Sequence, residues 1–451
     1  MANTVAKYQR YVEYKDSGVE WLGQIPEHWN VKRLGSFFEE RREKVSDIDY
    51  PALSVTKNGI VPQLDTAAKT DAGDNRKLVR VNDFVINSRS DRKGSSGISP
   101  YTGSVSLISI VMEPHRIYPA YAHHLLRSYP FQEEFYRYGK GIVADLWSTN
   151  SSEMKNILLP DFPIEEQFQI ANFLDHETTK IDSLIEKQQK LIELLKEKRQ
   201  AVISHAVTKG LNPDVPMKDS GNIWASEIPA HWKLTKLTYI AKVGNGATPA
   251  RDNEKYWKDG SVGWLNSSKV NDVIITQADQ FITPLAKNQT SVQVVQPNDL
   301  VMAITGEGQT RGRVAICQLD ATINQHLASI RIVDKNLYHE FLFYWLTANY
   351  ERIRYESTGA GSTKGAITCG DIGLYPVPLP PYSEQVEIVS QIKKQSLSFK
   401  QMIKKAESAI QLMQERRTAL ISSAVTGKID VRNWQNPNHN NNNEAQTELS
   451  Q

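Results

Sequence analysis

The sequence predicts an α+β protein with two α/β domains separated by two long helices, which pack as an antiparallel coiled coil with an internal pseudo-two-fold repeat. Three observations predict this fold. Two stretches of roughly 45 residues contain neither Gly nor Pro. Two sequence motifs each occur twice, in the same order. Each long stretch follows a region of short apolar runs, which are typical of buried strands.

The two long stretches span 164–209 and 382–426. Proline-rich segments precede both, and Gly210 and Gly427 follow them. Proline favours the beginning of a helix, and glycine favours its end because it adopts the left-handed conformation that a C-cap requires. At about 1.5 Å per residue, a helix of this length would extend over about 65 Å.

A seven-residue repeat runs along both predicted helices, and mixed charges occupy the opposite side of the first. Such a repeat indicates a coiled-coil partner. We expect the two helices to bury this seam against each other. The predicted seam residues are Leu174, Ile181, Gln188, Leu195 and Val202 in the first helix, and Ile392, Phe399, Ala406, Met413 and Leu420 in the second.

The long stretches align without a gap at an offset of 218, which matches Glu166 with Glu384 and Gln167 with Gln385. Two unrelated helices would not share so many identities. A repeat of this size indicates a duplicated unit.

A second repeated motif, Trp-x-x-x-Ile-Pro-x-His-Trp, begins at Trp21 and again at Trp224, an offset of 203. The second half therefore carries about 15 additional residues between this motif and its long helix. We interpret His28 and His231 as packing residues, because no Asp, Glu or Cys accompanies them at the spacing of metal ligands.

The regions between these motifs are expected to mix strands and helices. Strands are predicted at 83–87, 105–111, 299–304 and 327–332. One helix is predicted after the strands of each region, over 121–138 and 338–355. A small, basic loop follows the first strand of each region, at 88–97 and 305–313. Glycines there would let backbone amides approach a phosphate, although a solvated loop without a ligand is an equal alternative.

Composition narrows the function without deciding it. The chain has 53 basic and 51 acidic residues, and this balance neither requires nor excludes nucleic acid. Cys317 and Cys369 are too few for a disulfide framework or a four-cysteine zinc site. No apolar run reaches the roughly 20 residues of a membrane helix, and the polar N-terminus lacks a signal sequence, so we expect a cytoplasmic protein.

Motifs of catalysis do not occur in the sequence. We find no H-E-x-x-H, no nucleophile elbow, and no Asn/Asp-Pro-Pro-aromatic motif of amino-methyltransferases. We therefore predict a binding scaffold with no catalytic residues and no metal site.

The chain resembles the specificity (S) subunits of type I restriction–modification systems over about residues 15–428. The first marker is the proline lead-in followed by Glu-Gln and an apolar residue, which occurs at 159–170 and 377–388. The second is the Trp-x-x-x-Ile-Pro-x-His-Trp motif of each half. The resemblance implies five segments: a first target recognition domain (1–158), a central conserved helical region (159–212), a second target recognition domain (213–376), a C-terminal conserved helical region (377–428) and a tail (429–451). The low-complexity tail is expected to be disordered.

The resemblance implies a non-catalytic subunit that reads a bipartite double-stranded DNA sequence, with the coiled coil setting the gap between the half-sites. Its implied partners are two methyltransferase subunits, which use S-adenosylmethionine to methylate adenine N6. Restriction subunits that use ATP and Mg would add cleavage. The chain itself is expected to bind no cofactor.

Loop positions suggest which side chains contact DNA, since Arg and Lys neutralise phosphates and bond to guanine. The candidates are Arg89, Arg92, Lys93 and Lys140 in the first domain, and Lys269, Arg311, Arg313 and Lys364 in the second. Two alternatives stay open: a standalone DNA-modifying enzyme with fused recognition domains, and a coiled-coil adaptor that binds only proteins.

Overall fold

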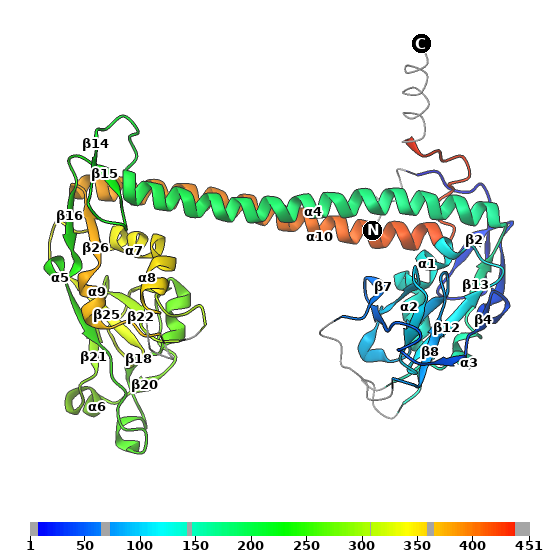
Figure 1. The fold of residues 1–451 in the computed structure, drawn as a ribbon, viewed down its shortest axis with the longest axis horizontal. Helices are drawn as coiled ribbons and strands as arrows, with labels where there is room; N and C mark the ends of the chain where they lie inside the picture. Colours follow the sequence, from blue (N-terminus) through cyan, green and yellow to red (C-terminus); the bar gives the residue numbers. More distant parts are fainter. Residues whose placement is uncertain (1–7, 65–72, 142–146, 307, 359–364, 438–451) are drawn as a thin grey trace, which may run out of the picture. The chain divides into compact units, whose positions relative to one another are not determined.

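The computed structural model describes residues 8–64, 73–141, 147–306, 308–358 and 365–437 (Figure 1). The chain forms two compact units, of which unit 1 comprises 1–189 and 407–451 and unit 2 comprises 190–406. Each unit thus combines one α/β domain with the beginning of one long helix and the end of the other. The five segments predicted from the sequence stay a prediction, since one compact unit can contain parts of several segments.

Unit 1 is built on a four-stranded antiparallel sheet with the order β10-β9-β12-β4. Its strands are β10 (Ser96–Ile98), β9 (Phe84–Asn87), β12 (Ser109–Pro114) and β4 (Phe38–Glu40). A three-stranded sheet contains β11 (Gly103–Val105), β8 (Arg76–Val79) and β5 (Lys44–Val45). Three strand pairs complete the unit: β1 (Tyr14–Asp16) with β2 (Gln24–Pro26), β6 (Leu53–Thr56) with β7 (Gly59–Pro62), and β3 (Asn30–Arg33) with β13 (Leu158–Asp161).

Unit 2 repeats the main sheet of unit 1 in the order β17-β25-β22-β23, with β19 added at the edge. Its strands are β17 (Ala241–Asn245), β25 (Leu327–Ile332), β22 (Leu300–Ala303), β23 (Val314–Cys317) and β19 (Ile274–Ile275). A second sheet contains β20 (Phe281–Ile282), β18 (Val262–Leu265), β24 (Ala321–Ile323) and β21 (Gln293–Val295). The strand pairs are β14 (Met217–Asp219) with β15 (Glu227–Pro229), and β16 (Lys233–Lys236) with β26 (Pro376–Leu379).

The matching sheets show where the second half gained residues. The offset between equivalent strands is 203 at β4 and β17, 216 at β9 and β22, and 218 at β12 and β25. Most of the additional residues therefore lie between β17 and β22, in the segment that forms β18, β20 and β21.

The helices after the main sheets differ from the prediction. The structure has α1 (Pro119–Arg127) and α2 (Tyr129–Arg137) in place of one helix, and likewise α7 (His339–Ala348) and α8 (Tyr350–Glu356). Ser128 is extended, and its hydroxyl accepts a hydrogen bond from Phe131 N at 3.4 Å. The predicted single helix over 121–138 was wrong because Pro130 has no N–H to continue the hydrogen-bond ladder. The short helices are α3 (Ser151–Met154), α5 (Leu237–Ile240), α6 (Pro284–Gln289) and α9 (Cys369–Leu374).

The predicted strand 105–111 is two strands joined by a turn. Strand β11 ends at Val105 and β12 begins at Ser109, whose N–H donates to Ser106 O at 3.0 Å. Leu107 and Ile108 in this turn are each 39% exposed. The apolar run had suggested burial, which these two side chains do not have. Strand β25 has the predicted bounds, 327–332.

The long helices are α4 (Ile164–Lys209) and α10 (Tyr382–Val425), which lie beside each other (Figure 1). The start of α4 packs against the end of α10 in unit 1, and the reverse holds in unit 2, so they run antiparallel. Six predicted seam residues are buried: Leu174, Ile181, Ile392, Phe399, Ala406 and Leu420. Four are half-buried: Gln188, Leu195, Val202 and Met413. In unit 1, Arg417 also pairs with Asp182 across the helices at 2.8 Å.

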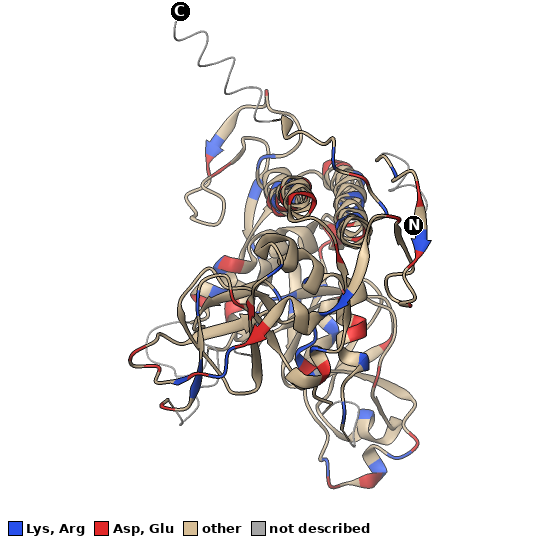
Figure 2. Ribbon diagram, turned by 90° about the vertical axis from the view of Figure 1, so that its right-hand side faces the viewer, with Lys and Arg blue, Asp and Glu red and all other residues tan. Residues whose placement is uncertain are grey.

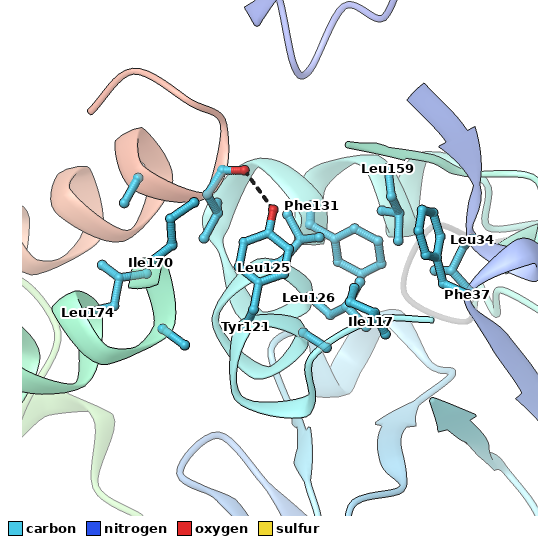
Figure 3. Packing of buried hydrophobic residues seen from close by; sticks show 14 of the residues in the cluster. Leu34, Phe37, Ile117, Tyr121, Leu125, Leu126, Phe131, Leu159, Ile170 and Leu174 are labelled. Atoms are coloured by element: carbon cyan, nitrogen blue, oxygen red, sulfur yellow. Dashed lines mark hydrogen bonds between the residues drawn. The ribbon is translucent and has the colours of Figure 1, made fainter. Parts of the chain in front are cut away.

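The core of unit 1 joins the domain to both long helices (Figure 3). Tyr121 and Leu125 of α1 belong to the same buried cluster as Ile170 and Leu174 of α4. The buried Tyr121 hydroxyl donates to Val425 O at the end of α10, over 3.2 Å. One tyrosine thus packs in the domain core and also satisfies a carbonyl at a helix end.

The beginning of the tail is folded, contrary to the expectation of disorder. Ile429 and Val431 are buried, and the Trp434 ring lies 5.5 Å from the Phe173 ring in an edge contact. These three apolar residues precede the polar run and outweigh its composition. Residues 438–451 lie outside the described part of the chain. None of the described helices is long and apolar enough to cross a membrane.

We predict that Gly427→Ala destabilises unit 1 by several kcal/mol. Gly427 has φ +75°, and an added Cβ would overlap the Pro26 ring. Gly18→Ala is the matched control, because Gly18 has φ +69° with nothing within 4 Å of an added Cβ. The control should lose only about 1–2 kcal/mol of stability, from the strain of alanine in the left-handed conformation. Urea denaturation of both variants measures the difference, and equal losses would contradict the packing argument.

Candidate nucleic-acid interface

A buried carboxylate joins the two repeated motifs of the first half. Glu166, at the start of α4, accepts hydrogen bonds on Oε1 from Trp29 Nε1 at 3.1 Å and from the Tyr11 hydroxyl at 2.5 Å. Its Oε2 lies 2.8 Å from His28 Nε2. Burial raises the pKa of Tyr11, so its hydroxyl stays protonated and keeps donating. The His-Trp motif therefore holds the start of the long helix.

The second half repeats this arrangement around Glu384. Trp232 Nε1 donates to Oε1 at 3.0 Å, and His231 Nε2 lies 2.9 Å from Oε2. The position equivalent to Tyr11 is Asp214, and the Glu384 side chain is 26% exposed, against 7% for Glu166. Both histidines thus contact a carboxylate at the start of a long helix, and their side chains are 40% and 45% exposed. The sequence had suggested packing between Pro and Trp without a carboxylate partner.

The glutamine after each carboxylate ties the helix to the domain. Gln167 Oε1 accepts from Tyr118 N at 2.9 Å, and its Nε2 donates to Phe162 O at 3.0 Å. Gln385 likewise accepts from Tyr338 N at 2.8 Å and donates to Pro380 O at 2.9 Å. Each Glu-Gln pair therefore joins the Trp motif, the proline lead-in and the segment before α1 or α7.

The main sheets place the basic loops. Strand β9 follows Asp83, which accepts from Arg41 Nε at 2.7 Å, and β22 follows Asp299, which accepts from Arg331 Nη2 at 2.6 Å. Hydrogen bonding to the aspartate raises the pKa of each arginine. The two halves thus anchor the same strand with arginines from different positions, because Arg41 follows β4 whereas Arg331 lies in β25. Each basic loop leaves the carboxyl end of this anchored strand.

In unit 1, two candidate loops meet. The backbones of Arg89 and Lys140 both form β-bridges to Ser148. Ser148 Oγ also donates to Ser88 Oγ at 3.0 Å. Residues that are about 50 positions apart in the sequence therefore form one surface. DNA contact by either loop stays a prediction from the sequence.

The basic side chains of these loops are accessible. The Arg92 side chain is 68% exposed. Lys93 pairs with Glu133, and Lys140 pairs with Glu153 at 2.6 Å. Exposed ion pairs of this kind are worth at most about 1 kcal/mol, so a phosphate can replace the carboxylate.

Lys269 of unit 2 is placed differently from the other candidates. Its side chain is 7% exposed and pairs with Asp272 at 2.5 Å and Asp279 at 3.4 Å. The hydrogen bond to Asp272 raises the pKa of Lys269. Two carboxylates neutralise this ammonium, and its structural role is to hold the segment around residue 270.

Arg311 and Arg313 of unit 2 lie in the β22–β23 loop. Arg311 is only 4% exposed, whereas Arg313 is half-buried and donates from Nη1 to Asn271 Oδ1 at 2.7 Å. Lys364 lies outside the described residues. The contact between Arg313 and Asn271 joins this loop to the segment before β19, which sequence reasoning had not paired with it.

Sequence reasoning missed the residues that hold the unit 2 loop. The Tyr350 hydroxyl of α8 donates to Gln309 O, and Arg354 Nη1 donates to Gly308 O, both at 2.5 Å. The sequence had predicted a helix here, over 338–355. A Tyr and an Arg spaced four apart could have indicated one helix face turned toward a loop.

Tyr136 of α2 makes the corresponding contact in unit 1. Its hydroxyl donates to Asn87 O at 3.4 Å, where the basic loop begins. Burial raises the pKa of Tyr136 to about 12, which keeps the hydroxyl protonated. Both loops are thus held by the second helix of their domain.

Charge on the whole chain does not single out a binding face. Figure 2 shows Lys and Arg interspersed with Asp and Glu, as a net charge of +2 implies. No group of three or more His, Cys, Asp or Glu suited to a metal ion occurs among the residues that the structure describes. Local loops, and not a general positive field, must provide contacts to an anion.

Residues 229–410 match the family model described as the type I restriction modification DNA specificity domain. The matched residues belong to the type I restriction–modification DNA specificity family. It is 24% identical over 437 residues to the putative type I restriction enzyme MjaX specificity subunit of Methanocaldococcus jannaschii, covering 91% of this chain and 96% of that one. It is also 24% identical over 303 residues to the EcoBI specificity subunit of Escherichia coli, covering 64% and 62%.

Two solved structures share the fold of this specificity subunit. The HsdS subunit from Thermoanaerobacter tengcongensis is 17% identical, with a TM-score of 0.55 over 90% of this chain and 98% of that one. A chain from a study of complex assembly and conformational transition of the type I restriction–modification system is 17% identical, with a TM-score of 0.68 over 90% and 99%. The family model and the curated relatives support a type I DNA specificity subunit, which is itself non-catalytic.

We predict that Glu166→Met costs about 3 kcal/mol of unfolding free energy, because it leaves the buried Tyr11 and Trp29 donors without an acceptor. Glu384→Met is the matched control, and it should cost less because Glu384 is partly exposed and has no tyrosine partner at the Tyr11 position. Urea denaturation measures both. A loss at Glu384 as large as that at Glu166 would show that the buried network is not the cause.

Proposed function

We propose that each α/β domain of this specificity subunit reads one half of a bipartite DNA sequence, and that the chain positions two methyltransferase subunits to methylate an adenine N6 in each half-site. The observation that supports this proposal is the shared order of the two main sheets, β4-β12-β9-β10 and β17-β25-β22-β23. Equivalent strands carry loops of different sequence. Two copies of one scaffold with different loops suit two different half-sites.

The exposed basic side chains would supply affinity. In unit 1 the loops of Arg89 and Lys140 meet at Ser148, and Arg92 and Lys93 follow Arg89 in the first loop. Each of these four side chains can neutralise a phosphate. In unit 2, Arg313 has the more accessible guanidinium. Lys364 stays a candidate from sequence alone.

Two candidates are assigned a different role. The charged groups of Lys269 and Arg311 are buried. We propose that they shape the loops of unit 2 and that they do not contact phosphate directly.

The long helices would set the gap between half-sites and also carry the partner subunits. Leu184, Leu191 and Leu194 of α4 are 44%, 43% and 49% exposed. Their spacing of seven and three residues places them on one face of the helix. An exposed apolar stripe on a helix is suited to a helical partner. We propose that methyltransferase subunits use this stripe.

The chemistry would belong to these partners. The methyltransferase subunits would bind S-adenosylmethionine, and restriction subunits, where present, would bind ATP and Mg. A complex that acts on the DNA of its own cell would work in the cytoplasm.

We predict that co-expression of this chain with its methyltransferase partner, in a host without adenine methylation, yields a split methylated motif. Methylated adenines should lie on opposite strands, one in each half. Genome-wide mapping of N6-methyladenine measures this directly. Methylation by the methyltransferase partner without the specificity chain would show that the partner acts on its own. A bound, competent partner without methylation would favour the protein-only adaptor, and methylation by the chain alone would favour the fused enzyme.

We predict that replacing residues 31–158 with the equivalent region of another specificity subunit changes one half of the motif only. The exchange keeps Glu166, Gln167 and both long helices, so the scaffold should be retained. The same mapping is the readout. A change in both halves would refute the assignment of one half-site to each domain.

A further inference from the structure

A turn occurs at equivalent positions in the two units, where the chain enters each domain's main sheet from another sheet. In unit 1 it joins β11 to β12, and in unit 2 it joins β24 to β25. Ser109 N donates to Ser106 O at 3.0 Å, and Leu327 N donates to Asn324 O at 3.0 Å. The offset of 218 between these pairs equals that of β12 and β25. The two turns therefore have the same geometry and place residues 107–108 and 325–326 at equivalent sites.

Both turns adjoin the start of a basic loop. Ser88 N donates to Ile108 O at 3.4 Å, and Ile304 N donates to His326 O at 3.0 Å. In unit 2 the Thr305 hydroxyl also lies 2.8 Å from His326 Nδ1. In unit 1 the exposed Arg89 follows at once. In unit 2 the half-buried Arg313 lies at the end of the loop but opposite its start, because Ala303 N donates to Arg313 O at 2.9 Å. Each turn is thus next to the groups that would contact phosphate.

The two turns differ in chemistry although they share a backbone. Leu107 and Ile108 are each 39% exposed, side by side and at the same end of the sheet as the basic loop. Their counterparts Gln325 and His326 are exposed and polar. Gln325 Nε2 lies 3.1 Å from His326 Nε2, and its Oε1 contacts the Thr248 hydroxyl.

Apolar side chains in one turn and polar side chains in the other suit two domains that bind different DNA sequences. Base edges in the major groove offer either hydrogen-bonding groups or the apolar thymine methyl, and side chains of matching chemistry distinguish them. Phosphate contacts fix the position of a protein on DNA but carry no sequence information. Neighbouring arginines and turn residues can divide these two tasks.

We propose that these turns are specificity determinants of the two domains. Leu107 and Ile108 contact an apolar base edge, such as the thymine methyl, in one half-site. Gln325 and His326 form hydrogen bonds with base edges in the other. This inference rests on the proposed function, because it names the residues that read bases within each half-site.

The test uses the complete complex with its methyltransferase partner and the same mapping of methylated adenines. The double variants are Leu107→Ala with Ile108→Ala, and Gln325→Ala with His326→Ala. Each should relax one or two base positions in one half-site, with roughly a 10- to 100-fold loss of preference there. The other half-site should be unchanged, and the two double variants should affect different halves.

The matched controls lie at the other ends of the same strands. Tyr239 is 74% exposed and lies next to the end of β17 that pairs with Ile332. Arg116 is exposed and follows the end of β12 that is distant from Ile108. Tyr239→Ala and Arg116→Ala should leave the motif as in the wild type. A relaxed motif in either control would overturn the assignment to the turns.

Three outcomes distinguish the role of the turns from the proposed function of the two domains. Double variants that keep the wild-type motif in both halves would overturn the role of the turns, while a split wild-type motif would still support the function. An unbroken wild-type motif would refute the two-domain reading, and the double variants would then show whether either turn reads bases at all. If a double variant fails to fold by circular dichroism, the isosteric Gln325→Glu supplies the readout, and an unchanged motif there would contradict hydrogen bonding by Gln325.

Discussion

The carboxylate at the start of each long helix is the interaction on which the architecture depends. Glu166 accepts from Trp29 and Tyr11 in a buried site, and Glu384 accepts from Trp232. A buried carboxylate is costly unless donors surround it, so packing of the Trp motif stabilises the start of the helix and its direction. The glutamine that follows adds two backbone contacts and makes that direction specific.

Much of the scaffold could be predicted because local signals and tertiary packing agree. Helix α4 has the predicted bounds, since no Gly or Pro interrupts it and Gly210 ends it with φ +77°. Breaks inside short helices were missed, because the aromatic pattern over 121–138 continues through Pro130. The apolar run at 105–111 was misread for a related reason. Hydrophobic residues usually indicate burial, whereas Leu107 and Ile108 face solvent in a turn.

The candidate interface was less predictable than the scaffold. Arg89 and Lys140 were chosen from loop composition, and only the folded chain brings both to Ser148. Lys269 has the same charge, but it is buried and pairs with Asp272 and Asp279. Asp272 lies three residues after Lys269, so that pair could be read from the sequence, whereas the burial of the lysine could not. The tyrosines that hold the loops were also hidden, because a helical aromatic looks the same in sequence whether it fills a core or donates to a carbonyl. Charge in a loop predicts a surface only when tertiary partners are known.

The uneven offset between the halves has an evolutionary consequence. Unit 2 has thirteen more residues between β17 and β22 than unit 1 has between β4 and β9. The strand order of the main sheet is nevertheless the same in both units. Length changes are thus absorbed in the peripheral sheet, and neither the anchored strand nor the helix start is displaced. A lineage can therefore try new loop sequences and lengths without first losing a foldable protein. Diversity of recognition would accumulate in such a chain more readily than diversity of architecture.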